Sequence, residues 1–96
     1  MSPLNKKKLI IIRSKLEKLD NSLIKLIKKR TNLVKKVLEL KESKKQIVDN
    51  VRIKKILTNI RKKSIKNKID PRITKKIWFN MIRAYIDFER RNFKKK

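Results

Sequence analysis

Apolar side chains recur at intervals of three and four residues along the first part of the chain, the spacing of one helix face. The positions of this seam are Ile12, Leu16, Leu19, Leu23, Leu26, Leu33, Val37 and Leu40. Arg30 stands between Leu26 and Leu33, where the pattern calls for another apolar side chain. A helix of about 40 residues would be ~60 Å long. Two shorter helices of the same chain could not cover it, so the seam predicts a homodimer, in which a second copy of the chain covers it.

The helix boundaries follow from the two prolines and the polar residues before them. Ser2-Pro3 and Asp70-Pro71 each combine a capping residue with a first helical residue. Between them, polar residues 42–46 interrupt the apolar pattern, and Asp49 or Asn50 could cap a further helix. We therefore predict a single all-α domain, residues 1–96, with helices over residues 3–43, 50–67 and 71–94.

The last helix carries an apolar stripe with one acidic residue at its edge. The stripe consists of Ile73, Ile77, Trp78, Met81, Ile82, Tyr85 and Phe88. Glu89 follows one turn after Tyr85. The commoner explanations for such charges are that Arg30 and Glu89 form a buried ion pair, or that each side chain reaches water.

Composition removes most enzyme mechanisms. The 96 residues include no Gly, Cys or His, so thiol nucleophiles, histidine bases, common zinc sites and Gly-rich phosphate loops are excluded. No metal or cofactor is expected. The 32 Lys+Arg against 8 Asp+Glu give a formal charge of +24. This excess is consistent with simple solvation of helix faces, with polyanion binding, or with an anionic small substrate.

No secretory signal can be recognised, because the apolar run at residues 9–12 is short and is followed by Arg13 and Lys15. No stretch approaches the ~20 apolar residues of a membrane span. We expect a cytoplasmic protein.

Two of the cations, Arg30 and Lys41, fall on the same face of the first predicted helix. The 11 steps from Arg30 to Lys41 return to within ~20° of the same helix face over ~16 Å, so both side chains could lean toward one ligand. Arg13 lies ~25 Å from Arg30 and ~100° round the helix. It could join such a site only from a second, antiparallel chain.

With these positions in place, the chain resembles the AroQ-class, or type II, chorismate mutases, whose three-helix subunits intertwine as dimers. The resemblance extends from about Ile12 to Phe93. It rests on the ordered spacing of Ile12, Arg13, Leu19, Asp20, Arg30, Lys41, Asp49, Arg52 and Glu89. It implies an isomerase of the shikimate pathway and of aromatic amino-acid biosynthesis that converts chorismate to prephenate.

The resemblance also implies residue roles. Arg30, with Arg13 from the other subunit, would hold the two substrate carboxylates. Lys41 would donate to a carboxylate and to the ether oxygen, and Glu89 would donate to that oxygen from the other side.

Four further positions would line the substrate. The Asp49 backbone N–H would point at it, Arg52 would add positive charge nearby, and Tyr85 stands where the family often has Ser. Ile53 departs from the pattern, because many mutases have a Glu there that accepts from the ring hydroxyl. The related isochorismate pyruvate lyases also have an apolar residue at this place, so the lyase reaction stays open as an alternative.

A basic helical nucleic-acid-binding protein is the alternative from another class, supported by Lys6–Lys8 and Lys94–Lys96. It accounts for cations at the ends but not for Arg30 within an apolar seam, and a plain coiled-coil scaffold fails at the same point. For a mutase, nucleic acid would be bound only non-specifically.

Overall fold

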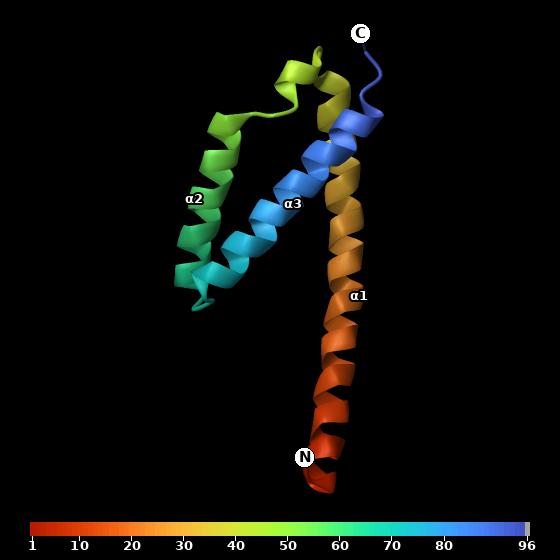
Figure 1. The fold of residues 1–96 in the computed structure, drawn as a ribbon, viewed down its shortest axis with the longest axis vertical. Coiled ribbons are helices and arrows are strands. Elements are labelled where there is room, and N and C mark those ends of the chain that lie inside the picture. The colour runs from red at the N-terminus through yellow and green to blue at the C-terminus, as the bar shows by residue number, and fades with distance from the viewer. Residues whose placement is uncertain (96) are drawn as a thin grey trace. The chain divides into compact units, whose positions relative to one another are not determined.

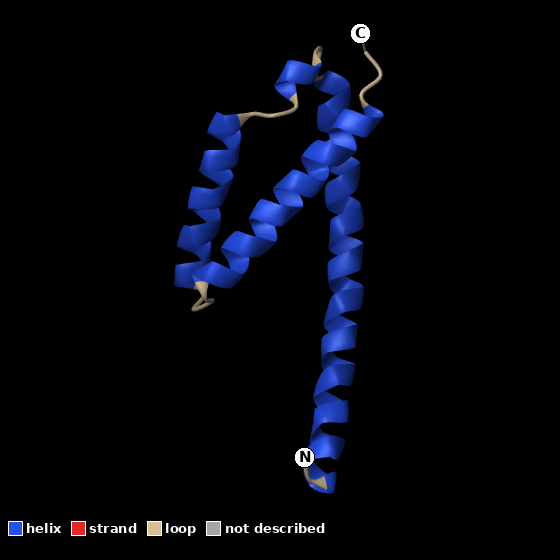
Figure 2. Cartoon of the chain, in the orientation of Figure 1, coloured by secondary structure: helices blue, strands red, loops and turns tan. Residues whose placement is uncertain are grey.

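The computed structural model describes residues 1–95 and shows three α-helices and one short 3-10 helix (Figures 1 and 2). The helices are α1 (Pro3–Leu40), α2 (Asn50–Lys66) and α3 (Pro71–Asn92), and the 3-10 turn η1 is Lys44–Gln46. There is no strand in the described part of the chain, so the all-α prediction is confirmed. None of the helices described is long and apolar enough to cross a membrane.

The predicted capping residues begin all three helices. The Ser2 hydroxyl accepts from the backbone N–H of Asn5 at 3.2 Å, and Asp49 accepts from that of Arg52 at 3.0 Å. Asp70 accepts from the backbone N–H of Arg72 at 2.9 Å, with Pro71 in the first turn. Each cap satisfies a backbone donor that has no partner within the helix.

The first helix ends earlier than the sequence predicts. It stops at Leu40 rather than near residue 43, because the chain turns there into η1. The Gln46 amide oxygen accepts from the backbone N–H groups of Glu42 at 2.6 Å and Ser43 at 3.4 Å. These bonds take the place of further helical backbone hydrogen bonds. Lys41 is therefore the first residue after α1 and not part of the helix.

The chain divides into two compact units, Met1–Val34 and residues 35–95. The first unit is a helical segment whose seam side chains are largely exposed, with Leu16 and Leu23 each at 53%. In the second unit, α2 packs against α3. The Ser64 and Thr74 hydroxyls, both buried, lie 2.6 Å apart across that contact.

The connection between α2 and α3 is a tight turn without glycine. Lys68 has φ of 57°, and the backbone N–H of Ile69 donates to the carbonyl of Ser64 at 2.9 Å. This is a Schellman ending, in which the left-handed position is usually glycine. It brings the chain back so that α3 can pack on α2.

Candidate functional site

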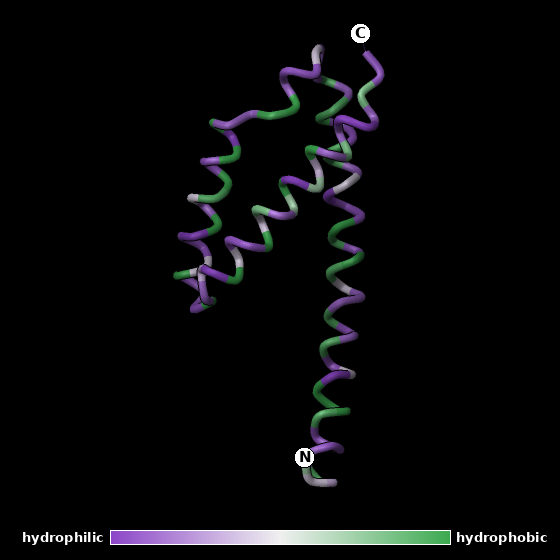
Figure 3. The backbone as a smooth tube through the Cα atoms, viewed as in Figure 1, coloured by the Kyte–Doolittle hydropathy of each residue, from purple (hydrophilic) through white to green (hydrophobic). Residues whose placement is uncertain are grey.

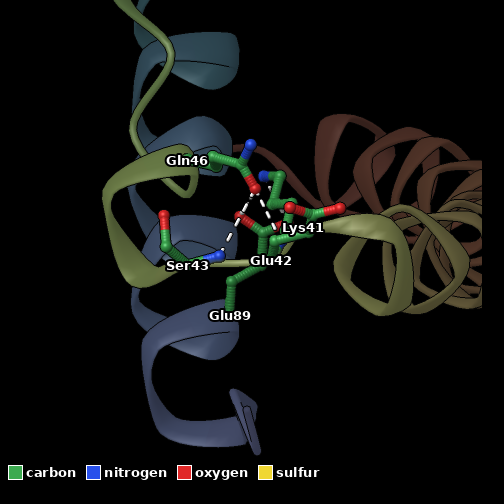
Figure 4. Close-up of polar contacts among 5 residues, drawn as sticks. All are labelled: Lys41, Glu42, Ser43, Gln46 and Glu89. Atoms are coloured by element: carbon green, nitrogen blue, oxygen red, sulfur yellow. Dashed lines mark hydrogen bonds and ion pairs between the residues drawn. The ribbon is translucent and has the colours of Figure 1, made fainter. Parts of the chain in front are cut away.

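The Lys41 ammonium and the Glu89 carboxylate form an ion pair in the second unit (Figure 4). Lys41 Nζ lies 3.0 Å from Glu89 Oε1 and 3.2 Å from Oε2, so one ammonium donates to both oxygens. The Glu89 side chain is 7% exposed and the Lys41 side chain 18%. A charge pair shielded to this degree from water interacts more strongly than an exposed one, but it has also lost hydration.

The turn after α1 holds Lys41 in place. The backbone N–H of Lys41 donates to the Leu38 carbonyl at 3.1 Å, which tightens the end of the helix. Ile47, 3% exposed, and Leu38, 8% exposed, are among the few buried apolar side chains of the described region. The Gln46 side chain closes the turn from the other end, as Figure 4 shows. The spacing of Ser43 and Gln46 matches a capping box, a sequence signal that could have predicted this turn.

Glu89 is positioned by α3. Tyr85 lies one turn before it on the same helix and is half-buried, so both side chains share one face. The family resemblance assigns Lys41 and Glu89 to the same substrate oxygen, and the structure brings these side chains, 48 positions apart, into direct contact. A pairing of Glu89 with Arg30 stays a prediction.

Asp49, Arg52 and Ile53 lie at the start of α2. The Asp49 side chain caps the helix, and its carbonyl accepts from the backbone N–H of Ile53 at 2.9 Å. Arg52 is exposed and Ile53 is half-buried. The helix N-terminus supplies partial positive charge at this place.

Arg13 and Arg30 belong to the segment Met1–Val34. Arg13 is exposed and Arg30 is half-buried. Their assignment to the substrate site stays a prediction, as do the assignments of Asp49, Arg52, Ile53 and Tyr85.

A hollow of about 340 Å³ in the second unit does not include the ion pair. Its lining includes Leu38, Phe88 and Phe93 with the lysines Lys35 and Lys95. Across residues 1–95, no cluster of acidic side chains could hold a metal ion.

The described part of the chain is thus an all-helical protein with a shielded lysine–carboxylate pair, and the sequence carries a large excess of cations. The family model of chorismate mutase type II matches residues 12–90. No curated protein and no solved structure gives a match to the chain. The family match covers most of the sequence, so the chain belongs to the chorismate mutase type II family.

Proposed function

We propose that this protein is a chorismate mutase that converts chorismate to prephenate. The observation that carries the proposal is the shielded Lys41–Glu89 pair, formed by the two residues that the family resemblance assigns to the ether oxygen of the substrate. Family membership supports the reaction class, and the cation excess suits a dicarboxylate substrate.

The reaction explains why such a limited set of residue types suffices. In this pericyclic rearrangement one C–O bond breaks while one C–C bond forms within the same molecule. The electrons move in a ring, and no nucleophile, metal or proton shuttle takes part. The enzyme must hold the dianion in its compact chair-like conformer and stabilise the negative charge that develops on the ether oxygen. Cationic side chains and hydrogen-bond donors perform both tasks.

In the proposed site, Arg30 and Arg13 of a second copy of the chain bind the two carboxylates. Lys41 donates to a carboxylate and to the ether oxygen. Arg52 and the N-terminus of α2 at Asp49 add positive potential, and Tyr85 and Ile53 shape the pocket around the ring. The second copy is part of the proposal, because Arg13 lies 17 residues before Arg30 on the same helix.

The ion pair adds a requirement to this mechanism. A carboxylate that accepts two bonds from Lys41 has no proton to donate. In the proposed mechanism Lys41 turns from Glu89 to the substrate. The donor role of Glu89 requires the neutral acid, because an ionised carboxylate would repel the charge on the ether oxygen.

Isochorismate pyruvate lyase activity is the second candidate. Ile53 favours it, because this half-buried apolar side chain cannot accept a hydrogen bond from the ring hydroxyl of chorismate. Glu89 favours the mutase, because the lyases have Gln at that place.

The two reactions are separated by supplying chorismate and isochorismate to the purified protein in separate reactions and identifying the products. We expect prephenate from chorismate, and lower turnover of isochorismate to salicylate and pyruvate. Lys41→Met should abolish turnover, whereas Lys45→Met, an exposed lysine in the same turn, should not. Salicylate and pyruvate as the main products would favour the lyase, and no turnover of either substrate would contradict both.

A further inference from the structure

The charges of α2 and the first part of α3 are unusually one-sided. Residues 50–86 contain twelve Lys and Arg and a single acidic residue, Asp70. The Asp70 carboxylate accepts from the Arg72 backbone at the start of α3. The other acidic residues of the chain lie before residue 50 or after residue 86.

The cations of α2 are exposed, away from the apolar side chains of the same helix. Its apolar side chains Ile53, Ile56 and Ile60 are half-buried, and Ser64 is buried against Thr74 of α3. At 100° per residue, Lys55, Lys62 and Lys66 lie on the opposite arc of the helix, and Lys54, Arg61 and Lys63 lie on its flanks. All six are exposed, and α2 contains no acidic residue. Figure 3 shows the alternation of hydrophilic and hydrophobic positions along this helix.

Three cations surround a hollow of about 220 Å³ between α2 and α3. Lys54, Thr58 and Arg61 follow the i, i+4, i+7 spacing of one helix face, and Lys75 faces them from α3. Leu57 and Ile60 form its apolar floor. In the region that the structure describes, no carboxylate pairs with these three cations. The hollow therefore offers two ammonium groups, a guanidinium and a hydroxyl to the oxygens of an approaching phosphate backbone.

The dimensions of this surface fit a nucleic-acid backbone. The 17 residues of α2 extend over ~25 Å, the axial length over which one strand of B-form DNA presents about seven phosphates. Neither α2 nor residues 71–75 at the start of α3 include an aromatic side chain, so this surface offers neither stacking for unpaired bases nor an anchor for a lipid interface. Both features favour a duplex contacted through its phosphates.

We propose that α2 and the start of α3 bind the phosphate backbone of double-stranded nucleic acid independently of sequence, with Lys54, Arg61 and Lys75 each contacting one phosphate. None of these three residues belongs to the proposed mutase site, so this binding can be tested apart from catalysis.

The test is fluorescence anisotropy of a labelled DNA duplex of mixed sequence with the full chain, at salt concentrations from about 50 to 200 mM. The wild-type affinity should fall steeply with salt. In the triple variant Lys54→Gln/Arg61→Gln/Lys75→Gln, the slope of log K against log salt should shrink by about 2.7, since each lost phosphate contact removes about 0.9. The control Lys6→Gln/Lys7→Gln/Lys8→Gln removes the same charge from α1 and should change the slope by less than about 1.

Three results would overturn the proposal. Equal losses in both triple variants would show that the overall charge binds DNA without a preferred surface. Salt-independent or absent binding of the wild type would exclude a phosphate interface. Tighter binding to phosphatidylserine-containing vesicles, lost in the same triple variant, would assign the surface to membranes. Circular dichroism checks folding, and if the triple variant unfolds, single Lys54→Gln and Lys75→Gln variants should each lower the slope by about 0.9.

Discussion

Glu89 is the single buried acidic side chain in residues 1–95, and its partner Lys41 comes from the turn after α1. Burying an ion pair gains little net stability, because the loss of hydration offsets the attraction. A pair with this geometry therefore fits a functional demand better than a stabilising one. In the proposed mechanism Lys41 and Glu89 separate, and each then donates a hydrogen bond to the ether oxygen of the substrate.

Replacing Glu89 tests its role as a donor. In Glu89→Gln the amide N–H can donate to the ether oxygen, so kcat/KM for chorismate should stay within about tenfold of wild type. Glu89→Leu has no donor and should lose on the order of 10² in kcat/KM. Glu39→Leu, which alters an exposed acid, should leave kcat/KM within about twofold of wild type. Equal kcat/KM for Glu89→Gln and Glu89→Leu would show that Glu89 is not the donor.

Lys68 provides a stability test that is independent of the site. A left-handed backbone costs a residue with a Cβ roughly 1 kcal/mol, so Lys68→Gly should stabilise the chain by up to about 1 kcal/mol. The matched change Lys62→Gly, at an exposed position inside α2, should destabilise it by about 1 kcal/mol. Urea unfolding of the three proteins measures both effects. Equal destabilisation by both substitutions would contradict the left-handed backbone conformation at Lys68.

At the scale of elements, local signals predicted the helix starts and missed one helix end. Capping residues and prolines act within one turn of themselves, so Ser2, Asp49 and Asp70 could be read from the sequence. The end of α1 depends on the Gln46 side chain reaching back to Glu42 and Ser43, which the apolar periodicity does not register.

The site was predictable to a similar extent. Glu89 and Lys41 were recognisable as unusual positions and through the family pattern. Their contact was not, because it depends on how α3 packs beside the turn after α1, and residue spacing within single helices carries no information about that packing.

Replacing Arg30 tests why a cationic residue interrupts the apolar seam of α1. Arg30→Ala should lower kcat/KM for chorismate by on the order of 10², because losing a carboxylate clamp in a water-excluded site costs about 3 kcal/mol. Lys29→Ala, at the exposed neighbouring position, should leave kcat/KM within about twofold of wild type. Similar kinetics for both variants would remove Arg30 from the site.

At the scale of the whole molecule, the exposed seam of α1 is the strongest indication of a second copy. Ile12, Leu19 and Leu26 are each more than half exposed, and Leu33 is 61% exposed. Apolar surface of this extent along one helix marks an interaction site. An antiparallel copy of α1 would cover it and would also bring Arg13 from the other chain.

The most direct test of the account is complementation between two inactive variants. Arg13→Ala and Arg30→Ala subunits are unfolded together, refolded as a mixture and assayed for prephenate formation. A heterodimer has one intact site and one doubly defective site, so a random mixture should recover about one quarter of wild-type activity, while each variant alone stays inactive. If sedimentation and mass spectrometry show that heterodimers form and no activity returns, the site is not shared between two chains and the proposed mechanism is wrong.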